Sequence, residues 1–189
     1  MSIIRFFGKK KSDDPVNSDM DRQRKYEALV RAYHRDLYRY AFWLCKDQSV
    51  AEDLVQETFL RAWRSLESLK DQNAAKSWLI TILRRENARR FERKRFDLVD
   101  IEEHQVEDHI SIATEQEIEN HLLRRQINKL EPEYREPLLL QVIGGFSGDE
   151  IANILELNRN TVMTRLFRAR NQLKEALETS QEHRGAENG

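Results

Sequence analysis

The chain has 189 residues, of which 39% are hydrophobic and 34% charged, and its formal net charge is −1 at pH 7. This composition excludes an intrinsically disordered protein. Since it has no apolar run of about 18 residues and no secretory signal at its start, we expect no membrane insertion and a cytoplasmic location. Because Cys45 is the only cysteine and the five histidines are not spaced as metal ligands, we expect no disulfide, metal, cofactor, small-molecule substrate or catalytic site.

Two amphipathic helices are predicted in the first third of the chain. Residues 1–20 show no periodicity and are predicted to form a mobile tail. Apolar residues then recur at three-and-four spacing, which predicts a helix over 21–46. Ser49 and Glu52 have the spacing of a capping box, so the second helix is predicted to begin at Ser49.

A third helix is predicted to join an apolar half to a strongly basic half. It follows a polar connector at 67–76, and its apolar residues are Trp78, Leu79, Ile82 and Leu83. Between 84 and 95 there are seven basic residues and two acids. The first helical domain is therefore predicted over 21–96, with a basic surface at its end.

An acidic stretch follows, with nine acids and no Lys or Arg between 97 and 119. Its part over 97–114 has no sustained apolar period and is predicted to be a flexible linker. The chain thus alternates basic, acidic and basic, since residues 159–174 carry five basic residues and no acid. This alternation indicates two places that meet a polyanion, separated by one that does not.

A second helical domain is predicted over 115–178, with a mobile tail over 179–189. Pro132 suits the first turn of a helix, and Gly144-Gly145 is expected to end that helix. Pro137 fits only if it also lies in the first turn. The predicted fold class is all-α: two small helical domains on a flexible acidic linker.

A helix-turn-helix motif is predicted over 147–173. Ser147 and Glu150 form a capping box before a short helix, and a tight polar turn follows with Asn160 as the N-cap of the second helix. One face of the second helix is apolar and is expected to pack inward; it consists of Val162, Leu166, Ala169 and Leu173.

The opposite face of that helix has the residue types that contact DNA. It consists of Thr161, Thr164, Arg168 and Asn171, with Met163, Arg165 and Phe167 on its flanks. Arg pairs with guanine, Asn with adenine, and Thr or Phe with the thymine methyl, while the arginines attract phosphate. The alternative is two amphipathic helices with a solvated basic face. The short first helix, tight turn and acid-free second helix together favour DNA binding.

Four segments resemble the extracytoplasmic-function (ECF) sigma factors of bacterial RNA polymerase. They are Asp53-Leu-Val-Gln-Glu-Thr-Phe59, Ser77-Trp-Leu79, Phe146-Ser-Gly-Asp-Glu-Ile-Ala152 and Thr161-Val-Met-Thr-Arg-Leu-Phe-Arg-Ala-Arg170. Their order and spacing match from about Tyr26 to Leu177. The resemblance implies a transcription initiation factor that binds core polymerase, recognises the −10 and −35 promoter elements and assists promoter opening. It also implies an anti-sigma factor as a partner.

The resemblance assigns the second helix to docking on the clamp helices of the polymerase β′ subunit. The matching residues are Asp53, Leu54, Gln56 and Glu57. The alternative for the polar ones is an exposed polar helix face. An acidic, polar surface does not suit DNA, which supports a protein partner here.

The connector and basic helix over 71–95 are assigned by the resemblance to the −10 element and a flipped base of the separated non-template strand. The candidate residues are Asn73, Lys76, Ser77, Thr81, Arg84, Arg85, Asn87, Arg89 and Arg90. Trp78 could stack on a base, but its place in the apolar period favours the core. Many family members have Asn where this chain has Arg85, and the nearest Asn is Asn87, so the base selected at −10 is in doubt.

The second domain is assigned to the duplex −35 element and to the polymerase β flap. The candidate DNA contacts are Arg159, Thr161, Met163, Thr164, Arg165, Phe167 and Arg168. Position 163 is often Arg or Lys in the family, so Met163 removes a donor. For the acidic linker, a path toward the RNA exit channel and a purely solvated state both stay open.

Two other classes of function compete with a sigma factor, which performs no bond chemistry. One is a free-standing helix-turn-helix regulator, in which residues 21–96 form a sensing or dimerising domain. The other is an enzyme with an active site inside the helical domain. No nucleophile–base pair or ligand set in the sequence supports the enzyme.

Overall fold

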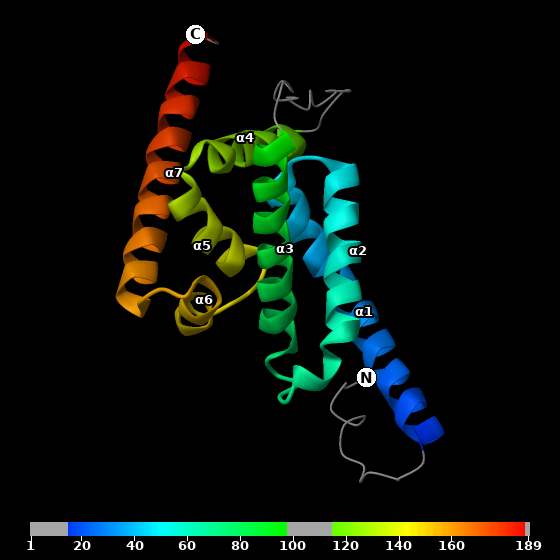
Figure 1. The fold of residues 1–189 in the computed structure, drawn as a ribbon. Coiled ribbons are helices and arrows are strands. Elements are labelled where there is room, and N and C mark those ends of the chain that lie inside the picture. Colours follow the sequence, from blue (N-terminus) through cyan, green and yellow to red (C-terminus); the bar gives the residue numbers. More distant parts are fainter. Residues whose placement is uncertain (1–14, 98–114, 188–189) are drawn as a thin grey trace. The chain divides into compact units, whose positions relative to one another are not determined.

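A computed structural model describes residues 15–97 and 115–187, with side chains over 19–93 and 122–179. All regular structure in these ranges is helical, as predicted (Figure 1). The elements are α1 (Pro15–Cys45), α2 (Gln48–Arg64), the 3-10 helix η2 (Leu66–Ser68), α3 (Ala75–Asp97), α4 (Glu115–Lys129), α5 (Pro132–Val142), α6 (Gly148–Leu155) and α7 (Arg159–Glu187). The chain forms two compact units, Met1–His104 and Gln105–Gly189. Residues 1–14 of the predicted tail and 98–114 of the predicted linker lie outside the described residues.

In the first unit, α1, α2 and α3 pack against one another as a three-helix bundle (Figure 1). Each helix contributes one buried stripe, and burying a large apolar side chain stabilises the fold by about 1.5–3 kcal/mol. The core residues are Leu29, Leu37, Tyr40 and Ala41 of α1, Ala51, Leu54, Val55, Phe59 and Ala62 of α2, and Leu79, Ile80 and Leu83 of α3. Tyr26 packs edge-on against Phe59 and Trp63, with ring centroids 6.3 and 5.1 Å apart.

The beginnings of α1 and α2 differ from the prediction. Helix α1 begins at Pro15, not at residue 21, so the end of the predicted tail is helical; proline is a favourable first helical residue because its ring already has a helical φ. Helix α2 is capped by Asp47, whose side chain accepts a hydrogen bond from the Val50 N–H at 2.9 Å. The predicted capping box at Ser49 is therefore wrong, because Ser49 already lies inside the helix.

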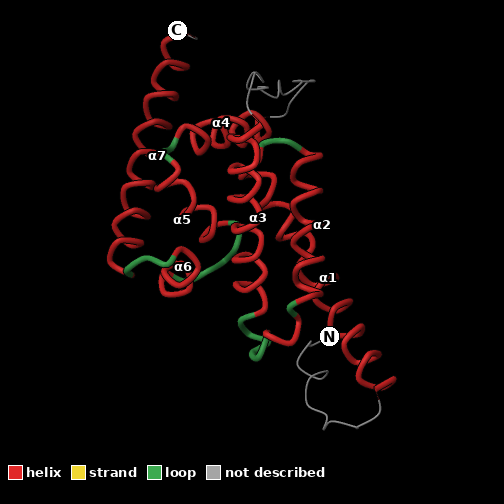
Figure 2. Tube along the Cα trace, in the orientation of Figure 1, coloured by secondary structure: helices red, strands yellow, loops and turns green. Residues whose placement is uncertain are grey.

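The connection from α2 to α3 contains η2 and an exposed loop, drawn green in Figure 2. Trp78, just after the start of α3, packs against a buried cluster of Leu29, Leu66 and Ala75. This contact confirms that Trp78 belongs to the core, and it fixes the first turn of α3 against α1.

In the second unit, α4, α5 and α6 pack against α7. The buried residues include Ile127, Leu130, Leu138, Leu139, Leu140, Phe146, Ile151 and Ile154. On α7, Val162, Leu166 and Ala169 are fully buried, and Leu173 is half-buried. The predicted inward face of this helix is thus confirmed.

The turn after α5 requires glycine. A Cβ on Gly144 would lie 2.4 Å from the Leu140 carbonyl oxygen and 2.5 Å from the Phe146 ring, and Gly145 has a φ of +71°. The predicted helix stop is therefore confirmed, as is Pro132 in the first turn of α5. Pro137 lies further inside α5, where its ring is buried and one backbone hydrogen bond of the helix is given up.

The helix-turn-helix is formed by α6 and α7. Ser147 and Glu150 make the predicted capping box, with each residue's backbone N–H bonded to the other's side chain. At the start of α7, the Asn160 N–H donates to the Asn158 side chain at 2.8 Å, and the Val162 N–H donates to the Asn158 carbonyl. Asn158, and not the predicted Asn160, therefore caps α7.

The two longest helices are α1 with 31 residues and α7 with 29. Helix α7 continues to Glu187, past the predicted domain end at 178. Along the described parts of the chain, none of the helices combines the length and the apolar content that crossing a bilayer requires.

Removing the observed cap of α2 should destabilise the first unit, whereas changing the cap first predicted should not. We expect Asp47→Ala to lower the free energy of unfolding by about 1 kcal/mol, since the Val50 N–H loses its partner and the helix N-terminus loses a favourable negative charge. Ser49→Ala is expected to change it by less than about 0.5 kcal/mol. All three tryptophans lie in the first unit, so urea unfolding followed by tryptophan fluorescence measures this unit alone. Equal effects of the two changes would contradict the assignment.

Candidate nucleic-acid and protein interfaces

The outer face of α2 is polar and acidic. Asp53 and Gln56 are exposed, and Glu57 is half-buried, with its carboxylate accepting a hydrogen bond from the Arg61 Nε at 2.8 Å. Leu54 does not share this face. It is 4% exposed and packs in the core of the bundle, so its assignment to a partner surface is wrong.

A shallow groove between α1 and α2 adjoins these polar residues. It is lined by Tyr26, Val30, His34 and Tyr38 of α1 and by Glu52, Val55, Gln56, Phe59 and Leu60 of α2. Leu60 is 48% exposed, and an apolar floor with a polar rim is typical of a protein-binding surface. Sequence reasoning missed Glu52 and Leu60, although their four-residue steps from Gln56 place all three on one helix face.

Two tyrosine hydroxyls of α1 stay protonated at neutral pH. Burial raises the pKa of Tyr26, and burial together with the negative charge of Asp36 raises the pKa of Tyr33. Both phenols therefore remain hydrogen-bond donors over the physiological range.

The side chains at the beginning of α3 contact other groups of the first unit. The Lys76 ammonium lies 2.6 Å from the Asp36 carboxylate of α1. Ser77 and Thr81 donate their hydroxyl hydrogens to the carbonyls of Ala74 and Ser77, respectively. Asn73 is exposed in the preceding loop, where its N–H donates to the Asp71 side chain. These contacts fix the side chains of Lys76, Ser77 and Thr81 at the beginning of the basic helix.

The basic half of α3 divides into an outward and an inward face. Thr81 and Arg84 are half-exposed and Arg85 is exposed. Asn87 is two residues after Arg85, about 200° further around the helix axis, and accepts a hydrogen bond from the Cys45 thiol of α1 at 3.7 Å. Asn87 therefore does not stand in for an asparagine at position 85, because the two side chains lie on different faces.

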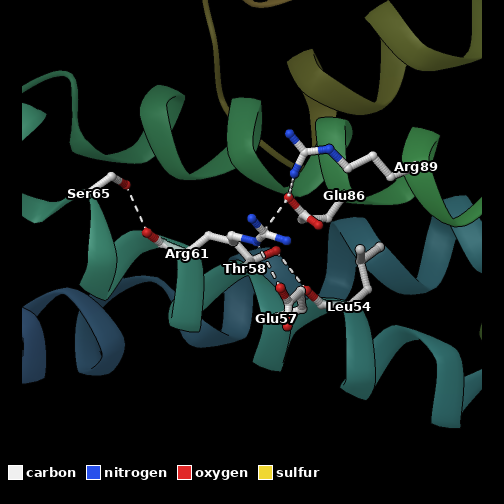
Figure 3. A network of polar contacts seen from close by, with 7 residues as sticks. All are labelled: Leu54, Glu57, Thr58, Arg61, Ser65, Glu86 and Arg89. Atoms are coloured by element: carbon white, nitrogen blue, oxygen red, sulfur yellow. Dashed lines mark hydrogen bonds and ion pairs between the residues drawn. The ribbon is translucent and has the colours of Figure 1, made fainter.

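Two further arginines of α3 contact other side chains of the first unit. The Arg90 guanidinium donates to the Cys45 sulfur at 3.8 Å and lies over the Phe91 ring. Arg89 pairs with Glu86. Glu86 is buried beside α2, where it also faces Arg61 (Figure 3). Sequence reasoning missed this buried carboxylate, because glutamate is rarely buried even at a position that continues an apolar stripe.

On α7, the face opposite the buried stripe is exposed along its whole predicted length. Thr161, Thr164 and Arg168 are exposed, and two large apolar side chains, Met163 and Phe167, are 43% and 63% exposed. Large apolar groups held in solvent by a rigid helix indicate a binding surface. The structure thus brings five of the seven candidates together.

Most basic residues of α7 are oriented by neighbouring elements of the same unit. Arg165 pairs with Glu133 at 3.1 Å and Arg159 with Asp149 at 2.9 Å. Arg170 donates to the Gln141 side chain at 2.6 Å, and Arg168 donates weakly to the Tyr134 hydroxyl at 3.4 Å. Among these four arginines, Arg168 therefore combines exposure with the weakest intramolecular contact.

Both units match known protein families. Residues 29–96 match sigma-70 region 2, and residues 120–173 match sigma-70 region 4. A region 2 domain followed by a region 4 domain defines a sigma factor, the class of protein that directs RNA polymerase to start transcription. The match over the first unit disfavours the alternative of a regulator with a sensing domain.

Relatives refine this assignment. The chain is 33% identical to the RNA polymerase sigma factor SigV of Bacillus subtilis, over 74% of its own length and 83% of that protein. It is 32% identical to the ECF RNA polymerase sigma factor SigL of Mycobacterium tuberculosis, over 75% and 85% of the two chains. The sigma factor RpoE of Bartonella quintana, solved with the anti-sigma factor NepR, has a TM-score of 0.63 and 29% identity over 84% of this chain and 97% of that one. The chain therefore belongs to the ECF RNA polymerase sigma factors and acts in transcription initiation.

Because Leu54 is buried in the core, we expect its truncation to lower the stability of the first unit. Leu54→Ala should lower the free energy of unfolding of the first unit by about 2–5 kcal/mol, because a buried side chain is replaced by a cavity. The adjacent exposed change, Asp53→Ala, should cost less than about 0.5 kcal/mol. Urea unfolding followed by tryptophan fluorescence distinguishes them. A stable Leu54→Ala variant with weakened polymerase binding would restore the original assignment.

Proposed function

We propose that this sigma factor binds core RNA polymerase through the outer face of α2, captures the separated −10 strand with α3, and contacts the duplex −35 element with α7. The observation that carries the proposal is the charge contrast within the first unit. One small bundle exposes an acidic, polar face on α2 and a basic face on α3, and no single polyanionic or polycationic ligand suits both.

For the polymerase contact we propose Asp53, Gln56 and Glu57, extended by Glu52 and Leu60 along the same groove. Leu60 supplies an exposed apolar anchor, and the surrounding polar groups favour a partner helix with basic side chains. We propose the clamp helices of the β′ subunit, implied by the family resemblance, as this partner. The second unit would in turn contact the β flap.

For the −10 element we propose that Asn73, Ser77 and Thr81 contact bases or sugars, while Arg84, Arg85, Arg89 and Arg90 contact the phosphates. Asn73 is exposed in the loop before α3, Ser77 and Thr81 are half-buried in its first two turns, and the arginines follow along the helix. A basic groove with polar pockets is the general arrangement for holding a single strand. Trp78 takes no direct part, because it packs in the core.

For the −35 element we propose base contacts from Met163, Thr164, Phe167 and Arg168, with Thr161 and Arg159 closer to the backbone. Arg168 is suited to a guanine edge and Phe167 to a thymine methyl group. Met163 offers no hydrogen-bond donor, so apolar contact replaces donor recognition at that position. Arg165 instead fixes α7 against α5 through Glu133.

Promoter opening requires no bond chemistry from this chain. Binding of the separated strand in preference to the duplex shifts the equilibrium between the two DNA states toward the open one. We therefore propose a non-enzymatic role in the cytoplasm, where polymerase and chromosome are found.

Activity is proposed to be controlled by an anti-sigma factor. The structurally similar RpoE of Bartonella quintana is bound to the anti-sigma factor NepR. A regulator of this kind that covered the α1–α2 groove would compete directly with polymerase. The acidic stretch over 98–114 lies outside the described residues. From the family resemblance we propose that this stretch runs toward the RNA exit channel of the polymerase.

The test is reconstitution with core polymerase. The purified chain should co-elute with core polymerase on size exclusion and support transcription from promoters found by mapping the transcript starts that its overproduction induces. Failure to bind core polymerase and to initiate at any such promoter would refute the proposal. Tight unaided binding to duplex promoter DNA, without transcription, would instead indicate a free-standing regulator.

The −35 assignment makes a separate prediction for Arg168. Arg168→Ala should reduce run-off transcription from a mapped promoter by about fivefold or more, because one bidentate base contact contributes about 1–3 kcal/mol. Arg170→Ala removes the same charge from the same helix, but that side chain is directed to Gln141, and we expect a change of about twofold or less. Neither change should alter the affinity for core polymerase; a loss there would mean that this face docks on the enzyme.

A further inference from the structure

A carboxylate is buried between α2 and α3 and faces two arginines. Glu86 of α3 is 7% exposed. Its Oε1 pairs with the Arg89 guanidinium and lies 3.5 Å from the Arg61 Nε of α2. The same Arg61 nitrogen donates to the Glu57 carboxylate at 2.8 Å. Figure 3 shows these four side chains as one continuous network.

The network alternates in charge from one surface of the bundle to another. Its order is Glu57, Arg61, Glu86, Arg89, and its two end members have side chains that are 40% and 49% exposed. Arg61 is 37% exposed, close to the 40% of Glu57, so only Glu86 lies in a position that is shielded from solvent. Charges in such a position interact more strongly than charges at the surface.

Packing does not require a carboxylate at this position. Leu79, Leu83 and Glu86 follow one another at steps of four and three on the buried stripe of α3. A leucine would suit that stripe, and a buried ion pair generally stabilises a fold no more than apolar residues of similar volume. The charge of Glu86 is therefore explained better by what its two arginines do than by the stability of the bundle.

We propose that Glu86 is a positioning residue that couples polymerase docking to DNA binding. The inference rests on the proposed function, which places Glu57 in the polymerase surface and Arg89 in the −10 surface. Without partners, Glu86 holds Arg89 and competes with DNA phosphate for it. When a polymerase cation engages Glu57, Arg61 turns toward Glu86, and Glu86 then holds Arg89 less strongly.

The coupling must also act in reverse, because linkage between two binding sites is reciprocal. A phosphate that engages Arg89 leaves Glu86 to Arg61, which in turn holds Glu57 less strongly. Glu57 is then more available to the polymerase. Each partner thus strengthens the binding of the other.

The DNA arm of the test uses the full chain and fluorescent oligodeoxythymidine, with affinity measured by anisotropy over a range of salt concentrations. Glu86→Gln keeps the shape but removes the charge that holds Arg89. It should raise affinity about two- to fivefold and steepen the dependence of log K on log salt by about 0.7, which corresponds to one further phosphate contact on a single strand. Glu92→Gln removes the same charge from an exposed position on α3 and is the matched control.

The proposal requires that Arg89 causes the difference in DNA affinity between Glu86→Gln and Glu92→Gln. In an Arg89→Ala background, Glu86→Gln should have no more effect than Glu92→Gln. Glu57→Gln is a second route that leaves the buried carboxylate intact: Arg61 then pairs with Glu86, and DNA affinity should rise about twofold. The double change Glu57→Gln and Glu86→Gln should not exceed Glu86→Gln alone, since both act through the same arginine.

The polymerase arm gives a result that a merely structural role would not produce. Without DNA, Arg89→Ala should strengthen binding of the full chain to core polymerase about twofold. Like an Arg89 that is bound to phosphate, the missing side chain leaves Glu86 to Arg61, so Arg61 holds Glu57 less strongly. Arg93→Ala, an exposed change on the same helix, should not. In a Glu86→Gln background the effect of Arg89→Ala should disappear.

The outcomes separate the two proposals. If Glu86→Gln behaves as Glu92→Gln toward DNA and Arg89→Ala as Arg93→Ala toward polymerase, the coupling is refuted while the proposed function stands. If the unaltered chain binds neither core polymerase nor the oligonucleotide, the proposed function itself fails. Unchanged tryptophan-monitored unfolding of the Glu57→Gln variant shows that its effect is not a loss of folding.

Discussion

The packing of α3 against α1 and α2 is the constraint on which the first unit depends. Leu79, Ile80 and Leu83 are essentially inaccessible to solvent, and they leave α3 only one orientation about its own axis. That orientation turns the arginine-rich side outward and at the same time leaves the polar side of α2 uncovered. A bundle of only three helices buries one stripe of each, so the remaining stripes are available for two partners of opposite charge.

In the second unit, contacts between α5 and α7 decide which basic side chains of α7 are available to a partner. Arg165 and Arg170 are held by α5, through Glu133 and Gln141. These contacts orient the helix and reduce the number of arginines that can bind phosphate without regard to sequence. What remains outward on α7 is a mixture of one weakly held arginine, hydroxyls and apolar groups. Such a surface favours base edges over bulk phosphate attraction.

The sequence predicts features that depend on periodicity and fails at those that depend on local backbone geometry. The inward face of α7 follows directly from the spacing of Val162, Leu166 and Ala169. The caps at Asp47 and Asn158 do not, because the competing residues Ser49 and Asn160 have equally good side chains and only the backbone decides which one precedes the helix. The candidate site shows the same division: motif matching included Leu54 with its polar neighbours, although helical periodicity turns it into the core. Glu86 continues the apolar stripe of α3 three residues after Leu83, but its pairing with Arg61 joins two helices, and no pattern within one helix indicates that contact.

The length of α7 has a practical consequence. From Arg168 to Glu187 the helix rises by about 28 Å, at 1.5 Å per residue. A fluorophore or affinity label joined beyond Glu187 would therefore sit at the end of a helical arm, well away from the side chains that we propose contact the promoter. This end of α7 suits surface immobilisation or distance measurements by energy transfer, because the proposed DNA-contacting end of the helix would stay accessible.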